Sequence, residues 1–346
     1  MIKAGIIGST GYAGQELVRL LINHKSAEIK WFGSKSYINK NFSDVYQNFF
    51  KIISDKCLDD NMEKLAEEVD VIFTATPQGF CSSLINEEIL SKAKVIDLSA
   101  DFRIKDVDVY EEWYELKHKS PQFLKSSAYG LCEINRELIK NSNLVANPGC
   151  YPTCTVLSVY PLLKEGLIDE NSIIVDAKSG ASGTGRSAKT DNLFCEINEN
   201  IKAYGVTNHR HTPEIEEQMS YAAGKTVKIN FTPHLIPMNR GILTTIYASL
   251  KNEQTYEEIS SVYDKYYSGE RFIRILDKDV LPQTRWVKGS NFTDINFKID
   301  SRTNRIIIIA AIDNLIKGAA GQAVQNMNIM FKIEETTGLM QVPVFP

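Results

Sequence analysis

The segment Asn147–Thr153, with the sequence Asn-Pro-Gly-Cys-Tyr-Pro-Thr, holds a cysteine that is placed for nucleophilic chemistry. The apolar run Leu144–Ala146 before it predicts a strand, and the apolar spacing after it predicts a helix, so Cys150 stands where the strand turns into the helix. A thiol at a helix N-terminus feels the positive end of the helix dipole, which favours the thiolate. Cys150 is therefore a candidate nucleophile, the alternative being a small buried core residue.

Two of the five histidines of the chain, His209 and His211, flank Arg210. Thr212 and Pro213 have the residue types of an N-cap and a first helical residue, so the two histidines belong to a loop that enters a helix. Imidazole titrates near neutral pH and can exchange protons with a nucleophile. No cysteine or acidic cluster at ligand spacing completes a metal site around them, so we expect no metal.

A second candidate site lies at the start of the chain, where the apolar strand Lys3–Gly8 runs into closely spaced glycines and then into the amphipathic helix Gln15–Ile22. Strand, glycine turn and helix in this order are typical of dinucleotide sites, where backbone N–H groups contact a pyrophosphate. The spacing is G-x-x-G-x-x-G rather than G-x-G-x-x-G, so an ordinary tight turn is the alternative. The residues expected to bind the cofactor here are Gly8, Ser9, Thr10, Gly11, Tyr12, Ala13 and Gly14.

The loop after the second expected strand bears on which dinucleotide binds. That strand covers Ile29–Phe32, and an acidic residue at its end is typical of proteins that hold the ribose 2′-hydroxyl of NAD. This chain has Ser34, Lys35 and Ser36 instead, and these side chains suit a 2′-phosphate. We therefore expect NADP, the alternative being that Lys35 is simply an exposed loop charge.

The order of the expected elements indicates an α/β fold. In the first part of the chain a buried strand, Val69–Ala75, ends at Thr76 and Pro77. A helix over Phe80–Leu90 and another strand over Lys94–Leu98 follow. Such alternation predicts a parallel, doubly wound sheet that binds ligands at the carboxyl ends of its strands, and this adds Thr76 and Pro77 to the expected cofactor site.

Beyond Cys150 the expected strands are separated by few helices, which predicts a mixed, largely antiparallel sheet. A last helix over about Gly318–Phe331 carries Ala, Gly and Met on one face. The charged and aromatic segment Asp106–Lys119 is expected to be an exposed excursion. The expected strands are 173–177, 227–231, 241–250, 272–276, 294–299 and 306–312.

Composition narrows the class of protein further. A length of 346 residues with 43% hydrophobic residues allows two domains with ordinary cores. A net charge of −4 without a basic stripe argues against nucleic acid as a partner. Apolar runs such as Ile306–Ile312 are too short to span a membrane, and the first residues leave no room for a signal peptide. Six cysteines without metal spacing or a disulfide framework favour a reduced, cytoplasmic compartment.

Six segments together resemble the N-acetyl-γ-glutamyl-phosphate reductases, the NADP-dependent enzymes of arginine biosynthesis. The chain is also more distantly similar to the aspartate-semialdehyde dehydrogenases. The segments occur in the expected order over nearly the whole chain, and their combination is highly specific although no single one is. They are Gly8–Gly14, Asp97–Arg103, Tyr129–Leu131 with Glu133, Asn147–Thr153, Ser179–Arg186 and His209–Glu214.

The resemblance implies a two-domain architecture. A Rossmann-type NADP-binding domain is expected at 1–149, completed by a C-terminal helix within 315–346. A catalytic and oligomerisation domain of the α+β class is expected at 150–314. A homodimer or a homotetramer is the expected assembly.

The resemblance also implies a reaction, the NADPH-dependent reduction of N-acetyl-L-glutamyl 5-phosphate to N-acetyl-L-glutamate 5-semialdehyde and phosphate. Cys150 is expected to form a thioester, His209 to move the proton and Glu214 to orient His209. The expected substrate contacts are Arg103, Asn147 and Arg210, and the further expected cofactor contacts are Ser179, Gly180 and Asn314.

Three alternatives remain open at this stage. The nearest is a relative that reduces an aminoadipyl phosphate, one carbon longer than the glutamyl substrate. The second is a thiol hydrolase or acyltransferase that uses Cys150 and His209 without redox chemistry, which leaves the glycine-rich turn unexplained. The third is an NADP-binding regulator without turnover.

Overall fold

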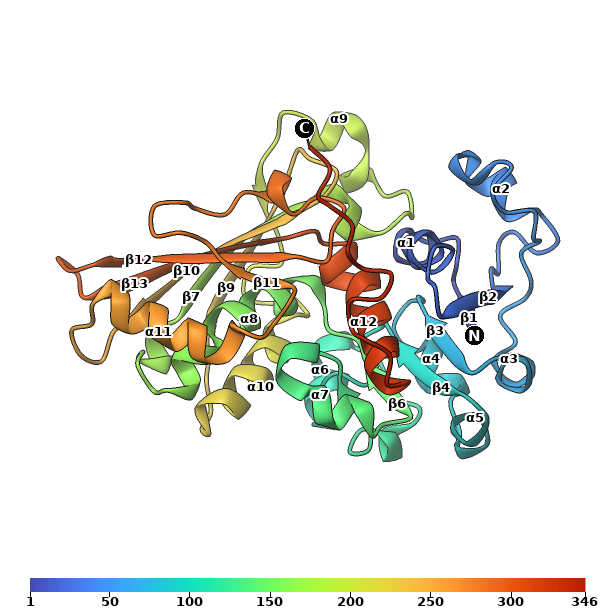
Figure 1. The fold of residues 1–346 in the computed structure, drawn as a ribbon, viewed down its shortest axis with the longest axis horizontal. Helices are drawn as coiled ribbons and strands as arrows, with labels where there is room; N and C mark the ends of the chain where they lie inside the picture. The colour runs from blue at the N-terminus through green and yellow to red at the C-terminus, as the bar shows by residue number, and fades with distance from the viewer. Residues whose placement is uncertain (346) are drawn as a thin grey trace. The chain divides into compact units, whose positions relative to one another are not determined.

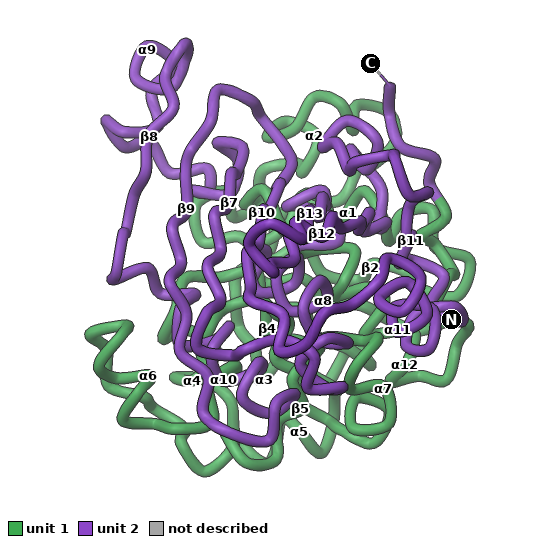
Figure 2. Tube along the Cα trace, turned by 90° about the vertical axis from the view of Figure 1, so that its left-hand side faces the viewer, with its two compact units in different colours: residues 1–148, 319–340 green, residues 149–318, 341–346 purple. Residues whose placement is uncertain are grey.

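The computed structural model describes residues 1–345, which form two compact units (Figures 1 and 2). The first unit comprises residues 1–148 and 319–340. The second comprises residues 149–318 and the segment from Gln341 onward. The first unit therefore takes a segment, residues 319–340, that follows residues 149–318 of the second unit in the sequence.

The first unit contains a six-stranded parallel sheet in the order β2-β1-β3-β4-β6-β5. All four residues of β3 are buried, as expected for a parallel strand that is covered on both faces. The doubly wound sheet predicted from the sequence is thus confirmed. The strands are β1 (Ile2–Ile7), β2 (Ala27–Phe32), β3 (Val71–Thr74), β4 (Lys94–Asp97), β5 (Ala128–Tyr129) and β6 (Leu144–Ala146).

Helices cover both faces of this sheet: α12 packs against α1 and α7, whereas α3 packs against α5. One helix predicted over Phe80–Leu90 is instead two, because Asn86 interrupts it and caps the second piece, its side chain accepting from the N–H of Ile89 at 2.9 Å. The helices of this unit are α1 (Tyr12–Leu21), α2 (Phe42–Val45), α3 (Met62–Glu68), α4 (Phe80–Leu84), α5 (Glu87–Lys92), α6 (Val107–Tyr114), α7 (Cys132–Lys140) and α12 (Gly321–Met330).

The segment Asp106–Lys119 is not the exposed excursion that its charge suggested. It forms α6 and buries Tyr110 and His118. The hydroxyl of Tyr110 donates to Oδ1 of Asp101 at 2.8 Å, and Nε2 of His118 lies 2.6 Å from the Asp101 carbonyl oxygen. The segment therefore supplies one polar partner to the buried carboxylate of Asp101 and one to its backbone carbonyl, which composition alone does not reveal.

A second buried carboxylate, Asp97, ends β4 directly beside Asp101. Its Oδ1 accepts from the hydroxyl of Thr74 at 2.6 Å and its Oδ2 accepts from the hydroxyl of Ser99 at 2.6 Å. Burial, followed by the negative charge of Asp101, raises the pKa of Asp97 to about 6. The carboxyl ends of β3 and β4 are thus joined by a polar network whose charge depends on pH.

The second unit contains a seven-stranded mixed sheet in the order β11-β12-β13-β10-β7-β9-β8. Its pairings are antiparallel except for β11 with β12 and β7 with β9, which confirms the mixed, largely antiparallel sheet. The strand expected over 227–231 begins later than predicted. The strands are β7 (Ile174–Gly180), β8 (Lys202–Ala203), β9 (Asn230–Ile236), β10 (Ile242–Ser249), β11 (Ile273–Ile275), β12 (Thr293–Asp300) and β13 (Arg305–Ile312).

Helix α8 packs on β10 and β13, and α10 and α11 pack against α8, so these helices lie together on one side of the sheet (Figure 1). None of the helices in residues 1–345 is long and apolar enough to cross a membrane. The helices are α8 (Cys150–Lys164), α9 (Phe194–Ile197), α10 (Thr212–Ala223) and α11 (Tyr256–Tyr267), and a π-helix (Ile316–Ala320) leads to α12. Short 3-10 helices occur at Gln47–Phe49, Pro121–Phe123, Glu170–Ser172, Ala181–Thr184, Thr190–Asn192 and Thr284–Trp286.

We expect Asp97→Asn to alter how stability depends on pH. A raised pKa means that folded Asp97 holds its proton more tightly than unfolded Asp97, so its contribution is favourable below about pH 4 and is lost as the pH rises through about 6. The difference in urea midpoint, wild type minus variant, should therefore fall over this range. Asp108→Asn, at an exposed aspartate, is the control and should show no such trend. A constant difference for Asp97→Asn would contradict the assignment.

Candidate active site

The glycine turn between β1 and α1 leaves the start of the helix open to a ligand. Gly8 has φ of +75°, and a Cβ there would collide with the carbonyl oxygen of Ala75. A Cβ on Gly14 would collide with the carbonyl oxygen of Gly8, so both close approaches require glycine. Helix α1 begins at Tyr12, and its N-cap residue, Gly11, provides no side-chain cap. The N–H groups of its first turn therefore suit an anion such as a pyrophosphate.

Thr76 lies beside this turn, at the end of β3, as the sequence suggested. Its Oγ1 is buried and has no hydrogen-bond partner within residues 1–345. Its Cγ2 is 3.5 Å from the position that a Cβ on Gly8 would take. A buried hydroxyl without a partner next to the glycine turn fits a site that a polar ligand completes. Pro77 follows it in the loop between β3 and α4.

The loop after β2 divides into a buried residue and two exposed ones. Ser34 is 1% exposed, and its Oγ shares a hydrogen bond of 2.7 Å with Oγ1 of Thr10. Its hydroxyl therefore ties the loop to the glycine turn. Lys35 and Ser36 are exposed. Of the three residues expected at the 2′-phosphate, Lys35 and Ser36 are those placed to meet a ligand from solvent.

In the second unit, Cys150 is the first residue of α8, directly after its N-cap Gly149. Among the described cysteines only Cys150 and Cys195 are not buried. The N–H of Gly149 donates to Oε1 of Glu214 at 2.8 Å, which holds the residue before the cysteine in place. A Cβ on Gly318 would lie 2.7 Å from the Cβ of Cys150, so the glycine there leaves room for the thiol.

His209 lies in a ring of aromatic side chains that includes a neighbour of the cysteine. Its ring centroid is 5.6 Å from that of Tyr151, 5.3 Å from that of Tyr204 and 5.3 Å from that of Phe231. Burial, and then the positive charge of Arg210, lower the pKa of His209 to about 4. His209 is therefore neutral at physiological pH.

The backbone of His211 orients the His209 ring. The N–H of His211 lies 3.1 Å from Nδ1 of His209, so Nδ1 accepts and we assign the ring proton to Nε2. Glu214 accepts a hydrogen bond from the N–H of Gly149, and its orientation of His209 stays a prediction. Helix α10 begins at Thr212, with His211 rather than Thr212 as the cap residue.

Two tyrosines connect the cysteine with the histidine, and the sequence analysis did not single them out. The hydroxyl of Tyr204 donates to that of Tyr151 at 3.2 Å. Burial raises the pKa of Tyr204 to about 12, and the charge of Cys150 contributes. Burial also raises the pKa of Tyr151, with a smaller contribution from Cys150. Cys150 and His209 thus share both tyrosines as neighbours.

Arg103 and Asn147, expected to contact substrate, lie together in the first unit. Nε of Arg103 donates to the carbonyl of Asn147 at 2.8 Å, and Nη2 donates to that of Leu98 at 2.7 Å. The Asn147 side chain is fully buried and donates to the carbonyl of Ala319 at 3.1 Å. These bonds fix the orientation of Arg103. The bonds of Asn147 connect it to Arg103 and to Ala319, so this residue stabilises the fold. Arg210, the third expected contact, is exposed.

The loop after β7 is tied down by Asn314. The Asn314 amide donates to Oγ of Ser182 at 3.0 Å, and its oxygen accepts from the N–H of Gly241 at 2.7 Å. Ser179 and Gly180 form the end of β7, and Ser179 is buried. The described hydrogen bonds of Asn314 hold the loop that follows these residues. A contact between its side chain and the cofactor stays a prediction.

Two family models cover most of the chain. The model described as "Semialdehyde dehydrogenase, NAD binding domain" matches residues 3–142, and that described as "Semialdehyde dehydrogenase, dimerisation domain" matches residues 150–314. Among solved structures, aspartate semialdehyde dehydrogenase II of Vibrio cholerae, in complex with ASA, has a TM-score of 0.73 at 16% identity, over 96% of this chain and 98% of that chain. The enzyme of Candida albicans with NADP has a TM-score of 0.71 at 16% identity, with the same coverage. At this identity the likeness concerns the fold.

Curated relatives decide the family. The N-acetyl-gamma-glutamyl-phosphate reductase of Lachnoclostridium phytofermentans is 67% identical over 346 residues, covering all of both chains. That of Lachnospira eligens is 64% identical over 348 residues, also covering all of both chains. This chain belongs to the N-acetyl-gamma-glutamyl-phosphate reductase family. The resemblance drawn from the motifs is confirmed, and the chain is an oxidoreductase of this family.

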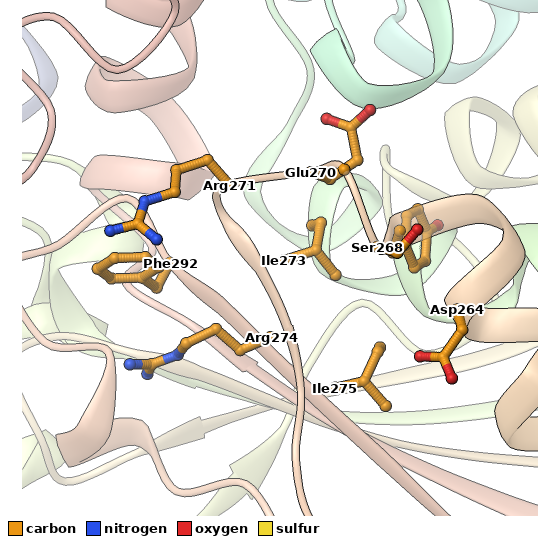
Figure 3. Close-up of a pocket in the computed structure, with 10 residues that line it drawn as sticks. Asp264, Ser268, Glu270, Arg271, Ile273, Arg274, Ile275 and Phe292 are labelled. Carbon is orange, nitrogen blue, oxygen red and sulfur yellow. The ribbon is translucent and has the colours of Figure 1, made fainter.

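One described cavity of this reductase-family chain includes no residue of the candidate active site. It has a volume of about 600 Å³ and lies between the end of α11 and β11 (Figure 3). Arg271 and Arg274 lie on either side of the Phe292 ring there. The Arg274 guanidinium stacks 4.6 Å from the ring centroid, and its Nε donates to Asp294 at 2.6 Å. None of the lining residues is a predicted site residue. Residues 1–345 contain no group of three His, Cys, Asp or Glu that could hold a metal ion.

We expect His209→Asn to lower kcat by roughly 10²–10³, the usual cost of losing one well-placed hydrogen-bond donor in a catalytic site. His211→Asn is the matched control, because it keeps the backbone N–H that bonds to Nδ1 of His209 and because asparagine is a favourable cap residue. Its loss in kcat should be much smaller. Steady-state kinetics of the two variants check this, and equal losses would show that the roles of the two histidines are misassigned.

Proposed function

We propose that this chain catalyses the NADPH-dependent reduction of N-acetyl-L-glutamyl 5-phosphate to N-acetyl-L-glutamate 5-semialdehyde and phosphate, in arginine biosynthesis. The observation that carries the proposal is a partly exposed cysteine at the first position of α8 that shares Tyr151 and Tyr204 with a neutral histidine. The names of relatives that align over the whole chain support the substrate.

In the first step the Cys150 thiolate attacks the acyl carbon. A carbon–sulfur bond forms, the carbon–oxygen bond to the phosphate breaks, and phosphate leaves with that electron pair. The position of Cys150 at the N-terminus of α8 favours the thiolate, because the helix dipole is positive there. The resulting thioester keeps the acyl group on the protein.

In the second step the thioester is reduced. NADPH, when bound, supplies the hydride that the acyl carbon accepts. The carbon–sulfur bond then breaks, the Cys150 thiolate leaves, and the semialdehyde is released. Covalent attachment has a clear use here, because it holds the acyl carbon in one place for the hydride.

His209 would act on the oxygen of the acyl group. With Nδ1 accepting from the backbone, its Nε2–H is the group left to donate. In both steps negative charge develops on the acyl oxygen, and a donor already in place stabilises it. This refines the expectation that His209 moves a proton, since the ring stays neutral above about pH 4. The rings of Tyr151 and Tyr204 make edge contacts with the His209 imidazole and hold its orientation.

The first unit offers residues that fit NADP. The uncapped start of α1 and the partnerless hydroxyl of Thr76 would hold the pyrophosphate side of the molecule. Lys35 and Ser36 would hold the 2′-phosphate, while Ser34 fixes their loop through Thr10. The match of residues 3–142 to an NAD-binding-domain model supports a nicotinamide cofactor. Arg103 would meet the substrate phosphate, its orientation set by two backbone carbonyls.

We also propose a homodimer or homotetramer formed through the second unit. The match of residues 150–314 to a dimerisation-domain model supports this. Helices α8, α10 and α11 lie on one face of the sheet. Buried residues alternate with half-buried ones along β10 and along the first part of β13. Leu243 and Tyr247 of β10, with Ile307 and Ile309 of β13, are half-buried between fully buried neighbours. They form an apolar face suited to a second copy.

We expect Cys150→Ser to abolish turnover while leaving the affinity for NADPH nearly unchanged. A serine hydroxyl has a far higher pKa than a thiol, so the nucleophile is lost, whereas the proposed cofactor contacts lie elsewhere. The assay follows phosphate-dependent NADP reduction with N-acetylglutamate semialdehyde, and NADPH binding is measured by fluorescence. Cys195→Ser, at the exposed cysteine, is the control. More than a few per cent of residual activity would rule out covalent catalysis at Cys150.

We expect Lys35→Ala to raise KM for NADPH while hardly changing KM for NADH. A charge-assisted bond to the 2′-phosphate contributes about 1.5–3 kcal/mol, so the ratio of the two KM values should change by roughly tenfold or more. Lys40→Ala removes an exposed positive charge from the same loop region and should leave the ratio as it is. An unaltered ratio in Lys35→Ala would mean that another residue reads the phosphate.

A further inference from the structure

The residue directly after β2 is a glycine that is held closely against the glycine turn. Dinucleotide-binding folds commonly place an acidic residue here, to hold the adenosine ribose. The N–H of Gly33 donates to the carbonyl of Ile6 at 2.8 Å, and its carbonyl accepts from the N–H of Ser9 at 2.8 Å and from the Ser9 hydroxyl at 2.9 Å. Gly33 therefore lies within reach of the cofactor turn but brings no side chain.

A carboxylate from elsewhere in the chain fills the space that a side chain on Gly33 would take. Oδ1 of Asp60 lies 2.6 Å from the position of a Cβ on Gly33. Backbone bonds place it there: the N–H of Leu58 donates to the carbonyl of Phe32, and the N–H of Ser34 donates to that of Leu58, both at 2.9 Å. The segment that precedes α3 thus runs beside the end of β2 and delivers an aspartate to it.

The surroundings of Asp60 connect the glycine turn with the loop expected to meet the 2′-phosphate. The backbone N–H groups of Gly8 and Lys35 both face its carboxylate. Its Oδ1 is buried against Gly33 without a hydrogen-bond partner within residues 1–345, while the residue as a whole is partly exposed. The neighbouring Asp59 is exposed, and its backbone carbonyl accepts from the indole N–H of Trp31 at 2.8 Å.

We propose that Asp60 supplies the carboxylate of the adenosine-ribose subsite and accepts a hydrogen bond from the ribose 3′-hydroxyl. This inference rests on the proposed nicotinamide cofactor. An ionised carboxylate can only accept hydrogen bonds, and a ribose whose 2′-oxygen carries phosphate has only its 3′-hydroxyl left to donate. Asp60 would then recognise the sugar, and Lys35 the phosphate beside it.

The test measures nucleotide binding rather than activity. Dissociation constants of NADP⁺ and of its analogue without the adenosine 3′-hydroxyl are determined by titration calorimetry for wild type and Asp60→Asn. Wild type should bind the analogue about tenfold more weakly, since a hydrogen bond to a charged group is lost. Asp60→Asn should bind NADP⁺ about tenfold more weakly and should distinguish the two ligands less than wild type does, because its amide oxygen can accept only an uncharged hydrogen bond. Asp59→Asn, which removes a charge one residue away, should behave as wild type.

Each other outcome has a definite meaning. An equal weakening of both ligands by Asp60→Asn would reduce Asp60 to a structural residue and overturn the inference. Tighter binding of NADP⁺ by the variant would show that the carboxylate opposes the 2′-phosphate, which also overturns it. Should Asp60→Asn fail to fold, Asp60→Glu, which moves the carboxylate by one methylene, must weaken NADP⁺ more than the analogue. Wild type that binds neither ligand would instead refute the proposed cofactor.

Discussion

The hydrogen bond from the N–H of Gly149 to the carboxylate of Glu214 is the constraint on which the candidate active site depends. Glu214 is 1% exposed, and the bond of 2.8 Å joins the first turn of α10 to the residue before α8. A hydrogen bond to a buried carboxylate is stronger than one between neutral groups, so it holds the turn firmly in place. The position of Cys150 follows from it, because the helix begins at the next residue.

The same pattern, in which backbone groups do the positioning, recurs through the site. The ring of His209 is oriented by the N–H of His211, and Arg103 is oriented by two carbonyls. Backbone partners leave side-chain groups such as Nε2 of His209 for chemistry. They also survive most substitutions of the residues that provide them, since every residue but proline keeps both its N–H and its carbonyl.

The sequence predicts those features that depend on residues close together in the chain. The glycine turn, the strand-to-helix turn at Cys150 and the order of strands are set by neighbours a few residues apart, and their periodicity shows them. Asp60 and Tyr204 were missed because their partners lie far away in the sequence. The sequence has no acid directly after β2, but Asp60 fills the space there from a distance that no pattern of spacing encodes. Likewise, the hydrogen bond from Tyr110 to the Asp101 carboxylate cannot be read from the composition of its segment.

Helix α12 has a consequence for how the chain is made. All ten of its residues are buried in the first unit, where Gln322 and Asn326 both donate to the carbonyl of Gly130. During synthesis these residues leave the ribosome only after residues 149–318 of the second unit have emerged. Until then the sheet of the first unit lacks part of its cover and exposes apolar surface, a state in which nascent chains aggregate or recruit chaperones. The first unit, although its synthesis starts first, is therefore completed only after most of the second unit.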